Sequence, residues 1–283
     1  MTVPYAEVIG DPIAHSKSPL IHKFWLEKLG LSWDFHRTRV TADQLEAFLE
    51  FRRQDPQWCG CSVTLPHKQT VLTLLDGAAN PVTLLGAANC IVRDRAGHLI
   101  GHNSDWLGFL EPLQPWLELD RLQQMARVIG TGGAAVAVSY ALDRSRFTIV
   151  NVARDADKAL ALRRRLELFD DDLITDIAGL GNEAEWGDRA NVLDLLVNAT
   201  PLGMAGFPPL PLSIHSQPRR SIVYDLVYHP LETELLRTAR EAGMVAIDGL
   251  AMLIGQAAVA FELFFSEPAP RQHDAELREV LTQ

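Results

Sequence analysis

The chain has 283 residues, a length that suggests two domains at the usual size of about 150 residues each. With 47% hydrophobic and 22% charged residues, its composition is that of a globular protein and excludes a fibrous or disordered chain. The formal net charge of −10 argues against a nucleic-acid partner. The longest apolar tract, 251–265, is interrupted by polar residues, so no membrane span is predicted.

The cysteines are Cys59, Cys61 and Cys90, and they lack the CxxC spacing of a zinc or thioredoxin-like site. Reduced thiols are the simplest interpretation, which favours a cytoplasmic protein and predicts no metal site. The N-terminus also lacks the basic and apolar segments of a secretory signal.

The N-terminal part alternates strands and helices. A strand from Tyr5 to Ile9 leads into a loop, and a helix follows over 19–29 because Pro19 suits a first helical turn. A second strand, 33–40, precedes a helix over 41–53 that Thr41 or Asp43 would cap. These two β-α steps predict an α/β domain.

Ser16 and Ser18 lie just before the first of these helices. A serine in that position usually caps the helix, because its oxygen accepts a hydrogen bond from a free N–H group. Two hydroxyls in one loop can also bind a carboxylate. The residues alone leave both roles open.

Two charged residues stand at expected helix starts. Pro66 is preset for the first turn of a helix from Lys68 to Leu75, where the helix dipole disfavours a cation. Lys68 is therefore either solvated or kept there for a task. Asp105 precedes a helix that begins near Trp106, where capping is the ordinary role of an aspartate.

A glycine turn marks the second domain. Gly130, Gly132 and Ala135 follow a short apolar strand at the spacing of the dinucleotide fingerprint, and a helix opens behind them. Phosphates would then lie on the helix N-terminus. A second strand, 147–150, follows at βαβ spacing, and polar side chains come after it where a ribose would lie.

Two later strands, 193–197 and 222–226, end in polar segments. Ligands bind beyond the carboxyl ends of parallel strands, so these segments are placed near the cofactor or substrate. A long apolar helix, 250–265, then packs back on the first domain. Its polar member, Gln256, needs a hydrogen-bond partner, which is either a ligand or a protein group.

The predicted fold is α/β with two domains. An N-terminal substrate domain covers 1–107, and a Rossmann-type, doubly wound dinucleotide-binding domain covers 108–248. C-terminal helices over 249–283 return to the first domain.

The loops resemble those of the shikimate dehydrogenase family along nearly the whole chain. The matching segments are 8–19, 60–68, 86–89, 103–108, 223–228 and 249–258. The resemblance implies hydride transfer between the ring 3-hydroxyl of shikimate, or a close analogue, and a nicotinamide cofactor. It also implies that Lys68 and Asp105 are the catalytic residues, which take and relay the hydroxyl proton.

The same resemblance implies two sets of binding residues. The substrate-binding set is Ser16, Ser18, Ser62, Thr64, Asn89, Tyr228 and Gln256. The cofactor-binding set is Gly130, Gly132, Gly133, Ala134, Asn151, Arg154, Asp155, Asn198, Thr200, Val227, Gly249 and Met252.

Two departures from the family pattern bear on specificity. Ser62 stands where the family usually has asparagine, which shortens a polar arm near the ring. The usual Asn-Arg-Thr after the second strand of the nucleotide domain is here 151–153, Asn-Val-Ala, which lacks the arginine. Since Asp155 would repel a 2′-phosphate, NAD is the expected cofactor and NADP the second option.

The substrate is expected to be a small cyclic hydroxy acid, and the protein a monomer or homodimer without nucleic-acid or membrane partners. Quinate and aminoshikimate are alternative substrates that the sequence does not rank. A non-catalytic nucleotide-binding sensor is a further alternative. It is disfavoured because a sensor has little need of Lys68, Asp105 and the two serines together.

Overall fold

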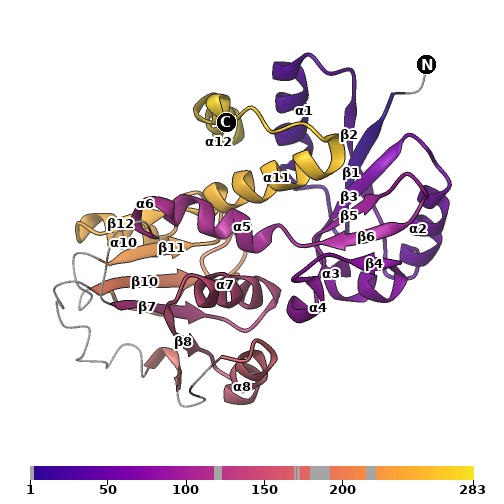
Figure 1. The fold of residues 1–283 in the computed structure, drawn as a ribbon. Coiled ribbons are helices and arrows are strands. Elements are labelled where there is room, and N and C mark those ends of the chain that lie inside the picture. Colours follow the sequence, from indigo (N-terminus) through magenta and orange to yellow (C-terminus); the bar gives the residue numbers. More distant parts are fainter. Residues whose placement is uncertain (1–2, 118–122, 169, 171–172, 179–191, 215–220) are drawn as a thin grey trace. The chain divides into compact units, whose positions relative to one another are not determined.

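The structure is a computed structural model that describes residues 3–117, 123–168, 170, 173–178, 192–214 and 221–283 (Figure 1). It divides into two compact units, Met1–Ser104 with Ile254–Gln283, and Asp105–Leu253. Each unit holds a six-stranded sheet with helices, which confirms the α/β class. The division falls at other residues than the expected 107/108 and 248/249 because α5 (Asp105–Leu110) packs on α7 (Gly133–Arg144), and α11 (Gly249–Phe265) starts against the second unit.

The first unit is built on a sheet with the order β2-β1-β3-β5-β6-β4. Its strands are β1 (Tyr5–Gly10), β2 (Asp34–Arg39), β3 (Trp58–Val63), β4 (Gly77–Ala78), β5 (Cys90–Arg93) and β6 (Leu99–His102). β1 runs parallel to β2 and β3, whereas β5 is antiparallel to β3 and β6. The carboxyl ends of β1 and β3 therefore lie at the same edge, and the loops that follow them are neighbours.

The helices of this unit are α1 (Ser18–Leu29), α2 (Leu45–Arg53), α3 (His67–Thr70), η1 (Val71–Leu74), α4 (Val82–Leu85), the part of α11 from Ile254, η3 (Arg271–His273) and α12 (Asp274–Thr282). α2 begins later than the expected 41, and neither predicted cap is used. The Thr41 hydroxyl instead donates to Asp43 at 2.6 Å, and Gln44 N–H donates to the Thr41 carbonyl at 3.1 Å. These bonds close a separate turn before the helix.

The second unit contains a parallel sheet with the order β12-β11-β10-β7-β8-β9. Its strands are β7 (Gln123–Ile129), β8 (Thr148–Val152), β9 (Ile174–Thr175), β10 (Val192–Asn198), β11 (Ile222–Asp225) and β12 (Val245–Ile247). The chain builds outward from β7 to β9 and then returns to β10 on the other side of β7. This reversal makes the carboxyl ends of β7 and β10 a topological switch point, the usual ligand position in such sheets.

The remaining elements of the second unit are α5, η2 (Glu111–Leu113), α6 (Gln114–Leu117), α7, α8 (Ala156–Arg165), α10 (Glu234–Glu241) and the start of α11. α7 packs on β7 and β8, and α10 packs on β11 and β12. Strand β10 is mostly apolar and almost entirely buried, as expected for a parallel strand covered on both faces. Among the helices of the described chain, none combines the length and apolarity that a bilayer crossing requires.

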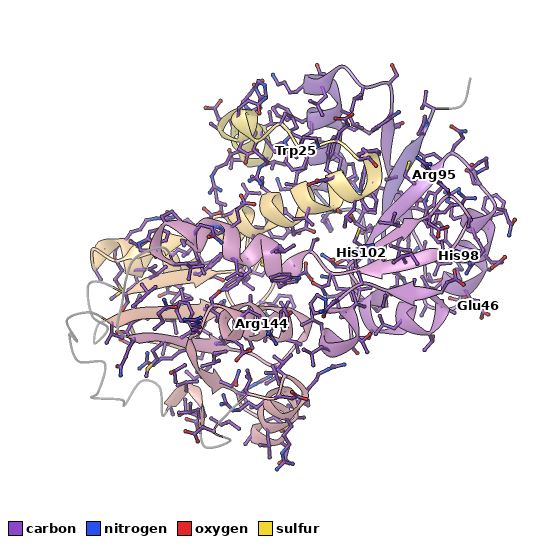
Figure 2. The ribbon with its side chains drawn as sticks, in the orientation of Figure 1. Trp25, Glu46, Arg95, His98, His102 and Arg144 are labelled. Atoms are coloured by element: carbon purple, nitrogen blue, oxygen red, sulfur yellow. The ribbon has the colours of Figure 1, made fainter. Side chains whose placement is uncertain are left out.

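An aromatic cluster in the first unit encloses His22 of α1. The imidazole stacks on Phe35 with ring centroids 4.0 Å apart and also contacts Trp25, which lies beside α11 in Figure 2, and Phe261. Neither ring nitrogen has a hydrogen-bond partner within the part of the chain that the structure describes. Burial lowers the pKa of His22 to about 3.

We predict that His22 makes the protein acid-sensitive. Between pH 6.5 and about 3 the unfolded chain binds a proton at this residue and the folded chain does not, so stability falls as the pH falls through this window. The contribution is up to about 1.4 kcal/mol per pH unit. His22→Leu should flatten this part of the stability profile, measured by urea unfolding from about pH 7 to about pH 4. An unchanged slope in His22→Leu would contradict the prediction.

Candidate functional site

The loop after β1 and the loop after β3 contact each other next to Gly10, the last residue of β1. Asp11 N–H donates to the Leu65 carbonyl and Thr64 N–H to the Ile9 carbonyl, both at 3.0 Å. A Cβ on Gly10 would lie 2.5 Å from Thr64 Cγ2 and 2.8 Å from the Leu65 oxygen. The loop after β1 therefore approaches the loop after β3 this closely only because Gly10 has no side chain.

The two serines lie at the start of α1. Ser16 Oγ accepts a hydrogen bond from Ser18 N–H at 3.3 Å and lies 3.3 Å from Ser18 Oγ. Within the described residues, no side chain caps this helix, whose N-cap position is Lys17. The Arg37 guanidinium, to which the sequence reasoning gave no role, donates to the Ser16 carbonyl. Two hydroxyls, a helix N-terminus and a cation form a favourable site for a carboxylate.

Ser62, Thr64 and Lys68 come from β3 and the turn that follows it. Ser62 is buried and pairs in register with Cys90, whereas Thr64 is half-buried. Lys68 is half-buried in α3, and its carbonyl accepts a hydrogen bond from Ala88 N–H at 2.8 Å. This bond attaches the lysine to the segment that carries Asn89.

Asn89 and Gln256, far apart in the sequence, meet in one polar cluster. Asn89 Nδ2 donates to Ser104 Oγ at 2.9 Å, and Ser104 N–H donates back to Asn89 Oδ1 at 2.7 Å. Gln256 Oε1 lies 3.4 Å from both Asn89 Nδ2 and Ser104 Oγ. Side-chain amides and a hydroxyl in this arrangement can bind ring hydroxyls.

No role was predicted for Ser104, although its position directly before the predicted catalytic residue Asp105 could have indicated one. Asp105 is the first residue of α5 and is 8% exposed. Since Ser104 is bonded to Asn89 through both its main chain and its side chain, the peptide that leads into Asp105 starts from a fixed point.

The glycine turn of the second unit lies at the switch point of its sheet. Gly130 has φ +115°, and a Cβ there would lie 3.1 Å from the Ala199 oxygen. Gly132 and Gly133 have nothing within 4 Å of their ideal Cβ positions, and Gly133 begins the twelve-residue helix α7. The N-terminus of α7, which includes Ala134, is therefore open to solvent. Its free N–H groups and positive dipole end fit a pyrophosphate.

The turn between β8 and α8 differs from its expected register. Asn151 is fully buried inside β8, where Nδ2 donates to Ser139 Oγ at 3.4 Å and Oδ1 accepts from Arg163 at 3.0 Å. Its side chain therefore lies in the protein interior. The Asp155 carboxylate caps α8 by accepting from Lys158 N–H at 3.2 Å, a bond that lowers the pKa of Asp155. Arg154 is exposed directly before this cap.

Asn198, Thr200 and Val227 of the predicted cofactor set, and Tyr228 of the predicted substrate set, lie at or just after the ends of β10 and β11. Asn198 and Val227 are buried, whereas Thr200 and Tyr228 are half-buried. Burial raises the pKa of Tyr228, so its phenol is neutral near pH 7.

Gly249 joins α11 to the loop after β11. Its N–H donates to the Val227 carbonyl at 3.2 Å, and a Cβ on it would lie 2.1 Å from the Leu226 oxygen. The close approach brings the first turn of α11, with the half-buried Met252, to the end of the sheet.

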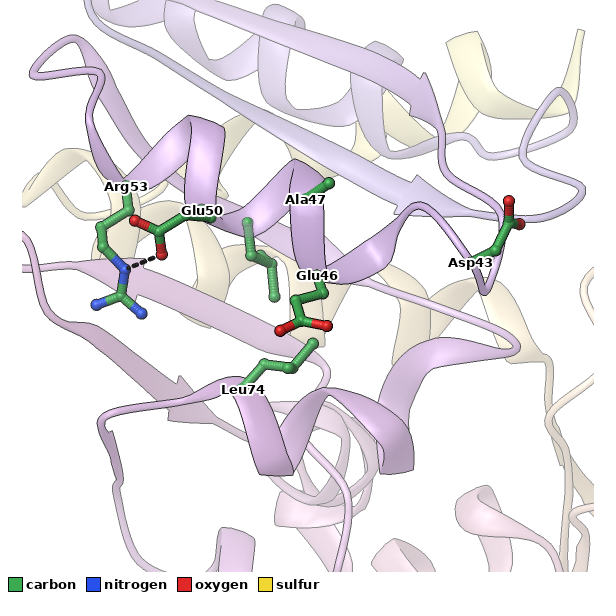
Figure 3. Close-up of a pocket in the computed structure, with 7 residues that line it drawn as sticks. Asp43, Glu46, Ala47, Glu50, Arg53 and Leu74 are labelled. Atoms are coloured by element: carbon green, nitrogen blue, oxygen red, sulfur yellow. Dashed lines mark hydrogen bonds and ion pairs between the residues drawn. The ribbon is translucent and has the colours of Figure 1, made fainter.

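A separate hollow of about 520 Å³ lies between α2 and η1 in the first unit (Figure 3). Its lining residues are Asp43, Glu46, Ala47, Leu49, Glu50, Arg53 and Leu74. Three carboxylates against one guanidinium make it unfavourable for an anionic substrate or cofactor. None of its lining residues belongs to the predicted site.

The parallel sheet, the glycine turn and the open helix end define a Rossmann-type dinucleotide-binding unit joined to a second α/β unit. Family models agree with this class. The model described as shikimate dehydrogenase substrate binding domain matches residues 8–91, and the one described as shikimate 5′-dehydrogenase C-terminal domain matches 249–276. A shikimate dehydrogenase (NADP(+)) of Sphingopyxis alaskensis is 48% identical over 98% of this chain and 97% of its own length. The chain belongs to the shikimate dehydrogenase family.

Two solved structures share the fold over almost the full chain. Shikimate 5-dehydrogenase of Thermus thermophilus, in complex with NADP(H) and shikimate, is 32% identical with a TM-score of 0.82, over 98% of this chain and 99% of that chain. Quinate dehydrogenase of Corynebacterium glutamicum, in complex with NAD, is 29% identical with a TM-score of 0.86 over the same shares.

We predict that Gly10→Ala destabilises the protein and weakens substrate binding. The added methyl group would overlap Thr64 Cγ2 and the Leu65 carbonyl oxygen, so the free energy of unfolding should fall by about 1–3 kcal/mol. Thermal unfolding and the KM for substrate are the measurements. Gly133→Ala is the matched control for stability, because its methyl group enters open space inside a helix and should leave stability equal or higher. Equal stability of Gly10→Ala and wild type would contradict the prediction.

Proposed function

We propose that the chain is a shikimate dehydrogenase that reversibly transfers a hydride between the ring 3-hydroxyl of shikimate and NADP. The observation that carries the proposal is the cluster of Asn89, Ser104 and Gln256. The cluster leads directly into Asp105 and connects to Lys68 through Ala88. The named activity of the Sphingopyxis relative supports the same reaction.

The proton chemistry belongs to Lys68 and Asp105. The nicotinamide, when bound, supplies the hydride acceptor. As the hydroxyl becomes a ketone it must lose its proton, and Lys68 takes that proton while the Asp105 carboxylate stabilises the charged lysine.

The remaining residues of the first unit hold the substrate. Ser16 and Ser18, with Arg37 beside them, bind the ring carboxylate. Asn89 and Gln256 orient the ring hydroxyls. Ser62 and Thr64 complete the substrate-binding residues of this unit, and Tyr228 of the second unit is the last member of the proposed set.

The expected preference for NAD is not supported by the relatives, whose names specify NADP(+). Two local observations support NADP. Asn151 and Val152 are buried and belong to β8. Position 152, where the family usually has arginine, is therefore not part of the turn that follows the strand. Asp155 is engaged in capping α8, and the exposed Arg154 precedes it as a cation for the 2′-phosphate.

A cytoplasmic location and a monomeric or homodimeric state are part of the same proposal. The free thiols of Cys59, Cys61 and Cys90 support the first, and size-exclusion chromatography would decide the second.

The function is tested by turnover of shikimate, quinate and aminoshikimate with NADP and with NAD. We expect the highest kcat/KM for shikimate with NADP. Quinate is a second candidate because the Corynebacterium neighbour is a quinate dehydrogenase. Binding of nucleotide without turnover of any of the three acids would favour the sensor instead.

Lys68→Ala should lower kcat by roughly 10²–10⁴, the range for loss of a general acid or base, while thermal stability and cofactor affinity stay near wild type. Steady-state kinetics and cofactor titration are the measurements. Lys23→Ala, at an exposed lysine of α1, is the control and should keep wild-type kcat. Retention of most turnover in Lys68→Ala would remove this residue from the mechanism.

Arg154→Gln should lower kcat/KM for NADP by roughly 10-fold to 150-fold, because one charge-assisted contact to the phosphate contributes about 1.5–3 kcal/mol. The value for NAD should change little, since NAD carries no 2′-phosphate. Arg165→Gln, at an exposed position of α8, serves as the control for loss of a positive charge. Equal losses with both cofactors would show that Arg154 does not distinguish them.

A further inference from the structure

A buried carboxylate, Asp225, ends strand β11 at the carboxyl edge of the second sheet. In the register of the sheet it pairs with Asn198, the last residue of β10. Asn198 is likewise fully buried. Two polar residues therefore stand side by side inside the edge at which a Rossmann-type sheet binds its ligand.

The Asp225 carboxylate accepts three hydrogen bonds. Its Oδ1 accepts from Asn198 Nδ2 at 2.9 Å and from Val227 N–H at 3.1 Å. Its Oδ2 accepts from Thr233 Oγ1 at 2.6 Å. Thr233 in turn caps α10 by accepting from Leu236 N–H at 3.3 Å. One carboxylate thus holds the loop after β11 and the start of the helix that follows.

Asn198 extends the network to the loop after β10. Its Nδ2 also donates to the Leu202 carbonyl at 3.0 Å, and its Oδ1 accepts from Thr200 N–H at 3.1 Å and Thr200 Oγ1 at 2.7 Å. Ala199 N–H donates to the Ile129 carbonyl at 2.9 Å, next to the glycine turn. The network therefore joins the loops that follow β7, β10 and β11.

We propose that Asp225 is a positioning residue for the cofactor, which acts through Asn198 and Thr233 to fix the loops after β10 and β11. The inference rests on the proposed function and on the expectation, implied by the family resemblance, that Thr200 and Val227 bind the cofactor. Asp225 is fully buried, so this role does not require it to touch the cofactor. Asn198, which the resemblance assigns to the cofactor-binding set, is equally buried.

A carboxylate suits this positioning role because its two oxygens accept several hydrogen bonds at once. Within the described part of the chain its partners are all neutral donors, so the charge serves as an acceptor for several N–H and O–H groups at once. Burial raises the pKa of Asp225, whereas the bonds from Thr233, Val227 and Asn198 lower it. Loss of this acceptor would leave three donors without a partner and release both loops.

The test compares Asp225→Ala with Asp194→Asn. Asp194 is a buried carboxylate of the same sheet near the start of β10, where it pairs with Arg127 at 3.2 Å, away from the carboxyl edge. Both variants should unfold at a lower temperature. Only Asp225→Ala should raise the Kd for NADPH, by roughly tenfold or more, measured by nucleotide fluorescence well below the unfolding temperature.

Asp225→Asn keeps the proposal testable if the alanine variant does not fold. Its side-chain oxygen can still accept from Asn198 and Val227, so the Kd for NADPH should stay closer to wild type than in Asp225→Ala. Thr233→Val should lower the unfolding temperature and raise the Kd only slightly. Amide hydrogen exchange at Thr200, Leu202 and Val227 should accelerate in Asp225→Ala and remain slow in Asp194→Asn.

A Kd within about twofold of wild type in folded Asp225→Ala, or equal rises in Asp225→Ala and Asp194→Asn, would overturn the inference. Where only Asp225→Asn folds, accelerated exchange together with an unchanged Kd would overturn it as well. Wild-type protein that binds NADPH but does not turn over shikimate would contradict the proposed function and leave the Kd comparison valid. Wild-type protein that binds neither nicotinamide cofactor would overturn both.

Discussion

The close approach of two main chains at the end of a central strand determines where the functional loops of each unit lie. In the first unit Gly10 lets the loop after β1 contact the loop after β3, and in the second Gly130 lets the turn after β7 contact the loop after β10. A methyl group at Gly10 would meet the Leu65 oxygen, which accepts a hydrogen bond from Asp11 N–H, and one at Gly130 would meet the Ala199 oxygen. The substrate-side and cofactor-side residues are therefore positioned by the same kind of constraint.

Buried polar side chains then fix the loops that these approaches bring together. Asn89 and Ser104 exchange hydrogen bonds in the first unit, and Asn198 donates a hydrogen bond to Asp225 at the sheet edge of the second. Such groups are costly to bury without partners, so each satisfied network specifies one arrangement of its loops. His22 is the contrast, since it is enclosed by aromatic rings that offer its nitrogens no hydrogen bond. His22 is expected to make stability depend on pH, whereas the hydrogen-bonded residues fix the arrangement of the loops.

Much of the fold follows from local patterns. The turn of Gly130 and Gly132, the apolar strand β10 and the long apolar helix α11 were predictable because each is a pattern of a few neighbouring residues. The start of α2 was not predictable, because Thr41 and Asp43 can either cap a helix or hydrogen-bond to each other in a turn, and here they form the turn. The turn after β8 was misread for a related reason. Asn151 is followed by Val152, which still belongs to the strand, so Asn151 lies two residues before the turn begins.

The sequence by itself determined the α/β class, the glycine turn, the residue types of the site and the family, because these depend on spacing along the chain. Only the tertiary structure decided which polar residues become neighbours. Gln256 meets Asn89, Arg37 meets Ser16, and Asp225 meets Asn198 and Thr233 through sheet register and helix packing. It also decided that Asn151 lies inside the protein while Arg154 is exposed. Burial and hydrogen bonding between distant segments depend on the packed chain as a whole, so no local pattern carries them.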